Sequence, residues 1–372
     1  MKIKFYKEED PTILISSLNE FQKDNFVGGI LILACDNNNV KQEEIDPILS
    51  AVKKPLFGAI FPGLIFDNKK HESGYIIAGI PARVEIVCIE HYSCRDTSFE
   101  EHLFSGLEKF QNIQTIFTFL DSFSRRITEL IESVFTTYGL EFNFIGGGAG
   151  SLSMEHKPCI ITNDGLKQDC VLLAGVNLAS GIGVQHGWEY LSGPYKVTSS
   201  DENTILELDF KPAYTVYKQV VEKYSGKSLN KENFYSYARA YPFGINKIDS
   251  EKVVRDPILV EDGDKLVCVG AVEQGLFVDI LSGTNSSLIA AAGKAVRMAL
   301  TNKGSEAEHF IFFVDCISRV LFLEDEFEKE LEEVTNIPGS LPVFGILSIG
   351  EIANNGRDYL EFYNKTSVIG CF

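Results

Sequence analysis

The chain has 372 residues, of which 45% are hydrophobic and 23% are charged, a composition typical of a globular protein long enough for two domains. Acidic side chains outnumber basic ones by 52 to 34, and the formal net charge of −18 repels the phosphates of nucleic acids and of anionic lipids. We therefore expect neither a nucleic-acid partner nor a membrane partner.

The beginning of the sequence, MKIKFYKEED, carries charges every few residues and lacks the apolar segment of a signal peptide. No apolar run in the sequence reaches the roughly 18 residues that a membrane helix needs. The eight cysteines are scattered without a C-x-x-C pair, a usage typical of reduced thiols in the cytosol. These features predict a cytoplasmic protein.

Three segments of the sequence repeat one order of elements: an apolar strand ending near an aspartate, a helix, a strand that contains glycine, and a further apolar strand. The first strands span 28–38, 114–124 and 309–319, with Asp36, Asp121 and Asp315 near their ends; the helices span 42–53, 125–139 and 324–336; and the glycine strands span 55–66, 142–153 and 341–352. The repetition predicts related halves of the chain.

A strand, a helix and a strand in series predict a parallel pair with a right-handed crossover, and the strand that follows is predicted as an antiparallel hairpin partner. The fold class is therefore α/β, with α+β-like mixed sheets flanked by helices. We place a domain boundary near residue 225, which gives domains 1–225 and 226–372. The aspartates and glycine turns of the repeats gather at the strand ends, where ligands of such sheets usually bind.

Glycine within a strand usually marks a bend, a bulge or a close approach to the backbone. Gly345 and Gly350 interrupt the strand LPVFGILSIGEI, and we expect them to leave room for a ligand. The run IGGGAG, which contains Gly147, lacks the G-K-[ST] ending of a nucleotide loop and is predicted to form a tight turn beside a small-ligand pocket.

His186 lies between glycines in the segment GVQHGWEY, followed by Gly187 and the single tryptophan of the chain, Trp188. Such glycines permit close approach, so we expect His186 to line a cavity. An ordinary histidine in a turn explains the pattern equally well. The other histidines show no metal-ligand spacing, and no metal site is predicted.

The segment VDCISRV places Cys316, Ser318 and Arg319 just after a strand. A guanidinium matches a carboxylate or a phosphate, whereas a nucleophilic cysteine requires a histidine base, and the nearest one along the chain, His309, precedes the same strand. We therefore favour ligand binding over catalysis, although Cys316 also fits core packing. Glu351 either accepts the amine of a ligand whose carboxylate meets Arg319, or pairs with Arg319 itself.

At these residues the chain resembles the FIST family, in which a FIST-N and a FIST-C sensory domain stand in tandem. The resemblance rests on an ordered set of short motifs from about residue 25 to the end of the chain: GGGAG, HGW, VTSSDENTILELDFKPAYTVY, YPFGI, VVRDP, GAVEQG, VDCISR and PVFGILSIGEI. Two positions depart from the family pattern. Ile60 and Phe61 replace a small polar pair, which weakens the case for a polar subsite there, and Ser318 replaces a glycine of C-x-G-R.

The resemblance implies an intracellular, non-catalytic sensor of a small ligand such as an amino acid or a derivative. No output domain or F-box is recognised in the sequence, so the signal is expected to pass to a separate protein such as a histidine kinase or a cyclase. Because some relatives look haem-binding, a nitric-oxide sensor with His186 as haem ligand is one alternative. An enzyme that uses Cys316 and a pure adaptor are the others; no cofactor is otherwise expected.

Overall fold

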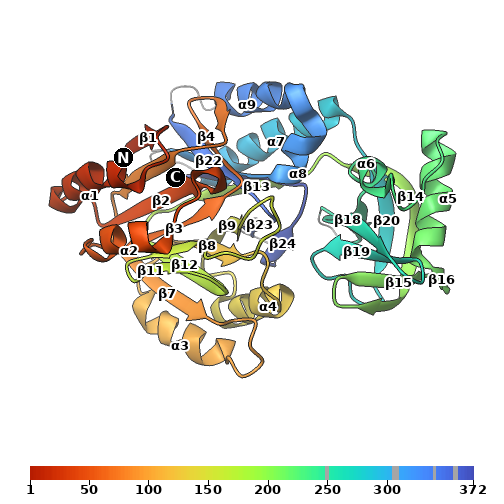
Figure 1. Cartoon of the computed structure of the whole chain (residues 1–372), viewed down its shortest axis with the longest axis horizontal. Coiled ribbons are helices and arrows are strands. Elements are labelled where there is room, and N and C mark those ends of the chain that lie inside the picture. Colours follow the sequence, from red (N-terminus) through yellow and green to blue (C-terminus); the bar gives the residue numbers. More distant parts are fainter. Residues whose placement is uncertain (248–250, 304–309, 338–340, 355–358) are drawn as a thin grey trace.

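The computed structural model of the chain describes residues 1–247, 251–303, 310–337, 341–354 and 359–372. Figure 1 shows a large body and a smaller lobe beside it. The body contains residues 1–188 and 284–372, and the smaller part, here called the distal lobe, contains residues 189–283. None of the described helices is long and apolar enough to cross a membrane.

The body consists of three units of equal topology: unit 1 (1–80), unit 2 (84–176) and unit 3 (181–188 with 284–372). Their four-stranded sheets have the orders β1-β6-β2-β3, β7-β12-β8-β9 and β13-β25-β21-β22. The strands are β1 (Lys2–Tyr6), β2 (Gly29–Cys35), β3 (Leu56–Phe61) and β6 (Tyr75–Ile80); β7 (Val84–Glu90), β8 (Thr115–Asp121), β9 (Asn143–Ala149) and β12 (Cys170–Val176); and β13 (Gly181–Gln185), β21 (Ile311–Cys316), β22 (Val343–Ser348) and β25 (Ser367–Cys371).

The predicted parallel pairs are confirmed as β2–β3, β8–β9 and β21–β22. Helices lie on the outer faces of the sheets: α1 (Leu14–Lys23) and α2 (Gln42–Ser50); α3 (Phe99–Lys109) and α4 (Ile127–Tyr138); and α7 (Asn285–Lys303), α8 (Ile317–Leu323) and α9 (Phe327–Asn336). Short 3-10 turns are η1 (Pro11–Ile13), η2 (Asp36–Asn38) and η3 (Glu324–Glu326). The α/β fold class with helix-flanked mixed sheets is therefore confirmed.

A hairpin from each unit completes the sheet of another unit. Hairpin β4–β5 of unit 1 joins β22, hairpin β10–β11 of unit 2 joins β3, and hairpin β23–β24 of unit 3 joins β9. Their bounds are β4 (Gly63–Phe66), β5 (Lys69–His71), β10 (Ile160–Thr162), β11 (Gly165–Lys167), β23 (Glu351–Ala353) and β24 (Glu361–Tyr363). The predicted hairpin partner was therefore wrong: β6, β12 and β25 pair antiparallel with the first strand of the parallel pair, because a neighbouring unit occupies the edge of the glycine strand.

A glycine stands at the same register position in each of the three glycine strands: Gly58, Gly146 and Gly345. A Cβ atom at any of them would lie 1.7–1.8 Å from a backbone oxygen of the parallel partner strand, that of Ile32, Thr118 or Phe313. A backbone atom in a sheet cannot move aside as the end of a long side chain can, so only glycine fits here. These glycines allow the approach of another strand rather than of a ligand.

Phenylalanine side chains meet where the inner faces of the three sheets pack together. The ring centroid of Phe117 in β8 lies 5.7 Å from that of Phe57 in β3 and 5.4 Å from that of Phe312 in β21. Alternate residues of the same strands, such as Ile116 and Phe313, pack instead against the helices on the outer faces. The three units therefore share one central core.

The distal lobe is inserted into unit 3 between β13 and α7. Its seven-stranded sheet has the order β14-β20-β17-β18-β19-β15-β16, and α5 and α6 accompany it. The bounds are β14 (Glu189–Asp201), β15 (Thr204–Leu208), β16 (Lys211–Pro212), α5 (Ala213–Ser225), α6 (Phe234–Ala238), β17 (Phe243–Ile245), β18 (Val253–Glu261), β19 (Lys265–Val269) and β20 (Phe277–Ser282).

Of the four sheets that the described residues form, three contain strands from both sides of residue 225. Residue 225 therefore does not divide the strands into separate sheets. The hairpin exchange and the inserted lobe explain why: both place strands that are distant in the sequence side by side. The predicted domain boundary near this residue stays a prediction.

We predict that replacing the central glycines with alanine destabilises the fold. Gly58→Ala, Gly146→Ala or Gly345→Ala should each lower the free energy of unfolding by roughly 2–4 kcal/mol, because the new methyl group meets backbone. Gly293→Ala in α7 is the matched control, since its methyl group meets only the flexible end of Glu333 and alanine favours a helix. Urea unfolding measures both effects, and equal stabilities for Gly58→Ala and Gly293→Ala would contradict the steric argument.

Candidate functional site

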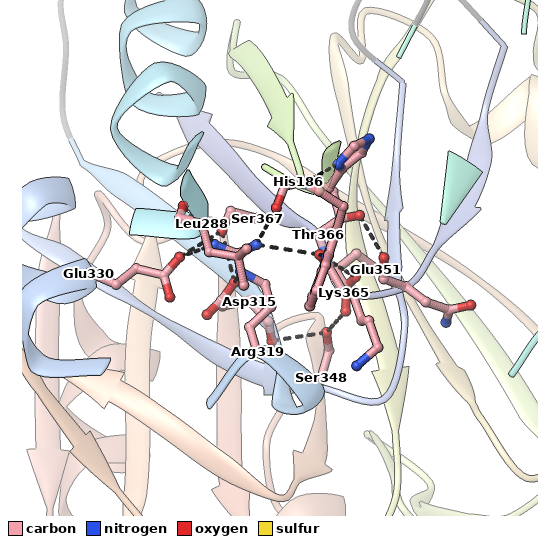
Figure 2. A network of polar contacts seen from close by, with 12 residues as sticks. His186, Leu288, Asp315, Arg319, Glu330, Ser348, Glu351, Lys365, Thr366 and Ser367 are labelled. Carbon is pink, nitrogen blue, oxygen red and sulfur yellow. Dashed lines mark hydrogen bonds and ion pairs between the residues drawn. The ribbon is translucent and has the colours of Figure 1, made fainter. Parts of the chain in front are cut away.

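Most residues that the sequence singles out gather in unit 3 at its contact with the distal lobe, the region drawn in Figure 2. Cys316, Ser318 and Arg319 lie at the end of β21 and the start of α8, and Glu351 begins β23. His186 follows β13, and its backbone oxygen accepts a hydrogen bond from Arg319. The structure thus brings together Arg319 and His186, which the predicted boundary assigned to different domains, and a ligand-binding role for these residues stays a prediction.

The guanidinium of Arg319 is completely buried and fully engaged by protein groups (Figure 2). Nη1 donates to the backbone oxygens of His186 (2.7 Å) and Lys365 (3.4 Å). Nη2 donates to the backbone oxygen of Leu288 (3.0 Å) and to the carboxylate of Glu330, while Nε lies 3.1 Å from Oδ1 of Asp315. Arg319 thus joins the end of β13, α7, α9, β21 and the segment before β25. Both Nη atoms donate to protein acceptors, whereas Nε lies within ion-pair distance of Asp315 without forming a hydrogen bond. The predicted ligand-binding role of Arg319 stays a prediction.

The buried cluster around Arg319 contains more carboxyl groups than cations. Its carboxyl groups are Asp256, Asp315, Glu330 and Glu351, and its cations are Arg319 and Lys365, all of them almost completely buried. Burial is the first cause that raises the pKa of each of these four carboxyls. The four carboxyls therefore bind protons more readily than exposed carboxyls do.

Glu351 does not form an ion pair with Arg319 among the described contacts. Its Oε1 accepts a hydrogen bond from the Ser348 hydroxyl at 2.8 Å, and its Oε2 accepts one from the backbone N–H of Thr366 at 3.2 Å. Burial raises the pKa of Glu351 to about 8, and these hydrogen bonds only partly oppose that rise. Glu351 is thus protonated in a large fraction of molecules at neutral pH.

Cys316 precedes α8, and Ser318 lies in the first turn of that helix. Cys316 is buried, and burial raises the pKa of its thiol well above the usual range, which opposes formation of a nucleophilic thiolate. The hydroxyl of Ser318 donates to Oδ2 of Asp256 at 3.1 Å, and the same oxygen lies 3.1 Å from the ammonium of Lys365. Ser318 therefore helps to tie unit 3 to β18 of the distal lobe.

His186 is buried, and both of its ring nitrogens face protein groups. Nδ1 accepts a hydrogen bond from the backbone N–H of Trp188 at 2.8 Å, and Nε2 lies 3.3 Å from Oε1 of Glu251. Burial, followed by the charge of Arg319, lowers the pKa of His186 to about 3, so the ring is neutral. Nε2 forms no hydrogen bond with a described residue, and the role of His186 as an axial haem ligand stays a prediction.

The glycines predicted to open a ligand pocket instead face protein atoms, and this correction covers four positions. A Cβ atom at Gly345 would meet the backbone of β21, and one at Gly350, where φ is +92°, would lie 2.1 Å from the ring of Phe362. A Cβ atom at Gly147 would lie 2.8 Å from Cβ of Ser348, and one at Gly187 would lie 2.6 Å from a backbone oxygen of α7. The run 145–150 is also mostly strand β9, not a turn.

Sequence reasoning missed three members of the cluster: Asp256, Glu330 and Lys365. Asp256 lies in VVRDP, a motif noted only for its family resemblance. Glu330 is one of many glutamates in the acidic helix α9 and reads as a surface charge. Lys365 lies in a turn with φ of +52°, for which the sequence carries no chemical signal.

An open cleft lies beside this cluster, between the body and the distal lobe. Its volume is about 520 Å³, and neither Arg319 nor Glu351 lines it. The body contributes one face of α4 and residues 359–362, and the distal lobe contributes parts of β17 and β18 with residues 271–276. Side chains of Phe135, Tyr359 and Phe362 give the cleft an aromatic lining.

Arg255 is the buried cation of this inter-lobe cleft and is only 6% exposed. Nε donates to the backbone oxygen of Ala271 at 2.9 Å, and Nη1 donates to those of Val254 and Phe362 at 3.0 and 2.9 Å. No described residue accepts a hydrogen bond from Nη2. The cleft therefore offers a fixed guanidinium nitrogen that a ligand carboxylate can reach.

Carboxylates surround the same cleft. Glu132 of α4, Glu273 of the distal lobe and Glu361 of β24 line it, and Lys247 pairs with Glu361. Burial, followed by the charges of Glu273 and Glu361, raises the pKa of Glu132. The carboxylates of Glu132, Glu273 and Glu361 on one cleft favour a cationic group of a ligand.

Two family models match the chain in tandem: the FIST N domain over residues 30–211 and the FIST C domain over residues 213–354. The chain belongs to the FIST family. FIST domains are sensory domains of signal transduction and are not known as catalytic domains. A comparison with curated proteins finds no significant match to this FIST protein.

We predict that Arg319→Met lowers the free energy of unfolding of this FIST protein by about 3–5 kcal/mol, because Asp315 and Glu330 stay buried without their cation. Arg297→Met is the matched control, since Arg297 forms an exposed ion pair with Glu333 and its loss costs about 1 kcal/mol or less. Urea unfolding followed by the fluorescence of Trp188 measures both. A loss at Arg319 no larger than at Arg297 would show that the cluster does not depend on its arginine.

We also predict a pH dependence that originates at Glu351. Its pKa is raised in the folded protein to about 8, so between about pH 5 and pH 8 the folded state holds a proton that the unfolded chain releases. Its contribution to stability therefore falls as the pH rises, by up to about 1.4 kcal/mol per pH unit. Urea unfolding at several pH values should show that, as the pH rises from 5 to 8, the free energy of unfolding falls less for Glu351→Gln than for the wild type. The exposed variant Glu333→Gln should keep the wild-type slope; a Glu351→Gln slope equal to the wild type would refute this assignment.

Proposed function

We propose that this FIST protein is a sensor of a small zwitterionic ligand comparable to an amino acid, which binds in the inter-lobe cleft. The observation that carries the proposal is the pairing of opposite charges in one cleft: Nη2 of the buried Arg255 has no described protein acceptor, and the carboxylates of Glu132 and Glu273 line the same cleft. A ligand carboxylate suits the first group and a ligand ammonium suits the second.

The aromatic lining supports a ligand with an apolar body. A volume of about 520 Å³ lies within the range of small-molecule sites, which combine apolar walls with a few charged groups that fix the orientation. Phe135, Tyr359 and Phe362 supply such walls. We therefore expect aromatic amino acids to bind more tightly than small polar ones.

The inter-lobe cleft is connected to the buried cluster through two adjacent residues of β18. Arg255 contacts the ligand site, and the next residue, Asp256, pairs with Lys365 and accepts the hydroxyl of Ser318. A ligand that contacts both the body and the distal lobe stabilises one arrangement of the two, since it gains contacts that other arrangements lack. We propose that a separate signalling protein detects this arrangement; its class, a histidine kinase or a cyclase, comes from the family resemblance alone.

We predict that thermal unfolding with each standard L-amino acid identifies at least one, expected to be aromatic, that stabilises the protein. At a concentration of 100 times Kd the gain is about 2.7 kcal/mol. Glu132→Gln should weaken binding about tenfold through loss of a charge-assisted contact. Arg255→Lys should weaken binding of the free amino acid. It should leave the affinity for the methyl ester unchanged, because the ester lacks the carboxylate. The melting temperature of this variant without ligand checks that it folds.

Glu129→Gln is the matched control on the same helix, because Glu129 pairs with Arg126 and does not line the cleft. It should bind the ligand as the wild type does. The proposal is overturned if no amino acid stabilises the wild type, or if Glu132→Gln and Arg255→Lys retain full affinity.

A further inference from the structure

The three units of the body create three equivalent junctions, where the hairpin of one unit joins the glycine strand of another. Two of them have very short connections from the glycine strand to the hairpin. Pro62 alone connects β3 to β4, and Ile349 with Gly350 connects β22 to β23. At the second of these, Ser122 donates to the backbone oxygen of Ile349 at 2.7 Å, so protein groups close the junction.

The third junction has a much longer connection, residues 150–159 between β9 and β10. The connection leaves at Gly150, whose N–H donates to the oxygen of Ile60 at 3.0 Å, and returns at Cys159, whose oxygen accepts from the N–H of Ile60 at 2.8 Å. Both ends are therefore fixed on one residue of β3. Compact surface loops whose two ends lie close together often carry binding sites.

This loop opens a cleft of about 340 Å³ between units 1 and 2. Ile60, Val40 and Leu166 contribute apolar side chains to its lining, as does Pro158. At the other two junctions the positions that correspond to Asp36 carry Ser122 and Ile317. The charged residue at this position is therefore particular to the junction that is open.

Asp36 is held in one orientation at the edge of this junction cleft. Its Oδ2 accepts a hydrogen bond from the buried hydroxyl of Ser151, and no described residue donates to its Oδ1. The hydroxyl of Ser151 is fixed in turn by Ser153, 2.8 Å away. One oxygen of a positioned carboxylate thus remains available to a ligand.

The unpaired charges of the junction cleft are negative. Lys157 lies 3.0 Å from Glu155, and Lys41 lies 3.7 Å from Glu44, so each lysine already has a carboxylate partner. Asp36 and Glu43 line the cleft and form no salt bridge among the described residues, although the charge of Asp36 contributes, after the hydrogen bond to Glu155, to raising the pKa of Lys157. The acidic first turn of α2 also offsets the positive end of its helix dipole.

We propose that the junction cleft is a second ligand site, which binds a short aliphatic amine: the ammonium group meets Oδ1 of Asp36, and the hydrocarbon body packs against Ile60, Val40 and Leu166. The site is independent of the inter-lobe cleft in both location and ligand class. A free carboxylate on the ligand is disfavoured, because it would meet Glu43 and Glu155 without an unpaired cation to bind it.

Isothermal titration calorimetry of the full chain with three probes that share the same branched hydrocarbon body tests this site. 3-Methylbutylamine should bind, 3-methylbutanol should bind at least tenfold more weakly because it lacks the charge, and L-leucine should also bind at least tenfold more weakly because of its carboxylate. No binding of the amine, equal binding of the alcohol, or equal or tighter binding of leucine that Asp36→Asn abolishes overturns the proposal; leucine binding that Asp36→Asn retains belongs to another site.

Matched variants locate the binding. Asp36→Asn keeps an oxygen for Ser151 but removes the charge, and it should weaken amine binding at least tenfold. Asp262→Asn, in an exposed turn of the distal lobe, should leave it unchanged. Glu132→Gln in the inter-lobe cleft should also leave amine binding unchanged. If Glu132→Gln loses amine binding while Asp36→Asn retains it, the assignment to the junction cleft is overturned. The amino-acid screen of the inter-lobe cleft can fail without affecting this result, so the two proposals are tested separately.

Discussion

The buried guanidinium of Arg319 is the interaction on which the arrangement of unit 3 depends. It reaches five segments that are far apart in the sequence, and its carboxylate partners lie on β21 and α9. Burying an ion pair contributes little net stability compared with an apolar pair of the same size, but removing one partner is costly. Its main effect is therefore to fix geometry: any other packing of these segments would leave a buried charge without its partner.

The surplus of carboxyl groups gives this cluster a second property. Burial raises the pKa of all four carboxyls, so the stability of the cluster is linked to pH. Lys365 and Asp256 extend the same network to the distal lobe. A change in the position of the lobe would therefore alter the surroundings of these titratable groups.

The body has a different organising constraint, the exchange of hairpins among three units. Each glycine strand is enclosed between its parallel partner and a foreign hairpin, which explains why Gly58, Gly146 and Gly345 recur at one register position. The exchange also sets where binding sites can form. The central core is filled by aromatic rings, so open space occurs at the periphery, at the junction that carries a long loop and at the contact with the inserted lobe.

The sequence by itself determined the repeated strand and helix order and the α/β class, because hydrophobic periodicity and the positions of strand ends are local properties. Only the tertiary structure decided what lies beside each element. A strand pattern with a period of two shows which face is buried but not which strand is the neighbour, so neither the hairpin exchange nor the backbone contact at Gly345 could be predicted. Glu330 and Lys365 resemble surface charges until α9 and the turn before β25 enclose them around Arg319, because the burial of a charge depends on partners that local sequence does not identify.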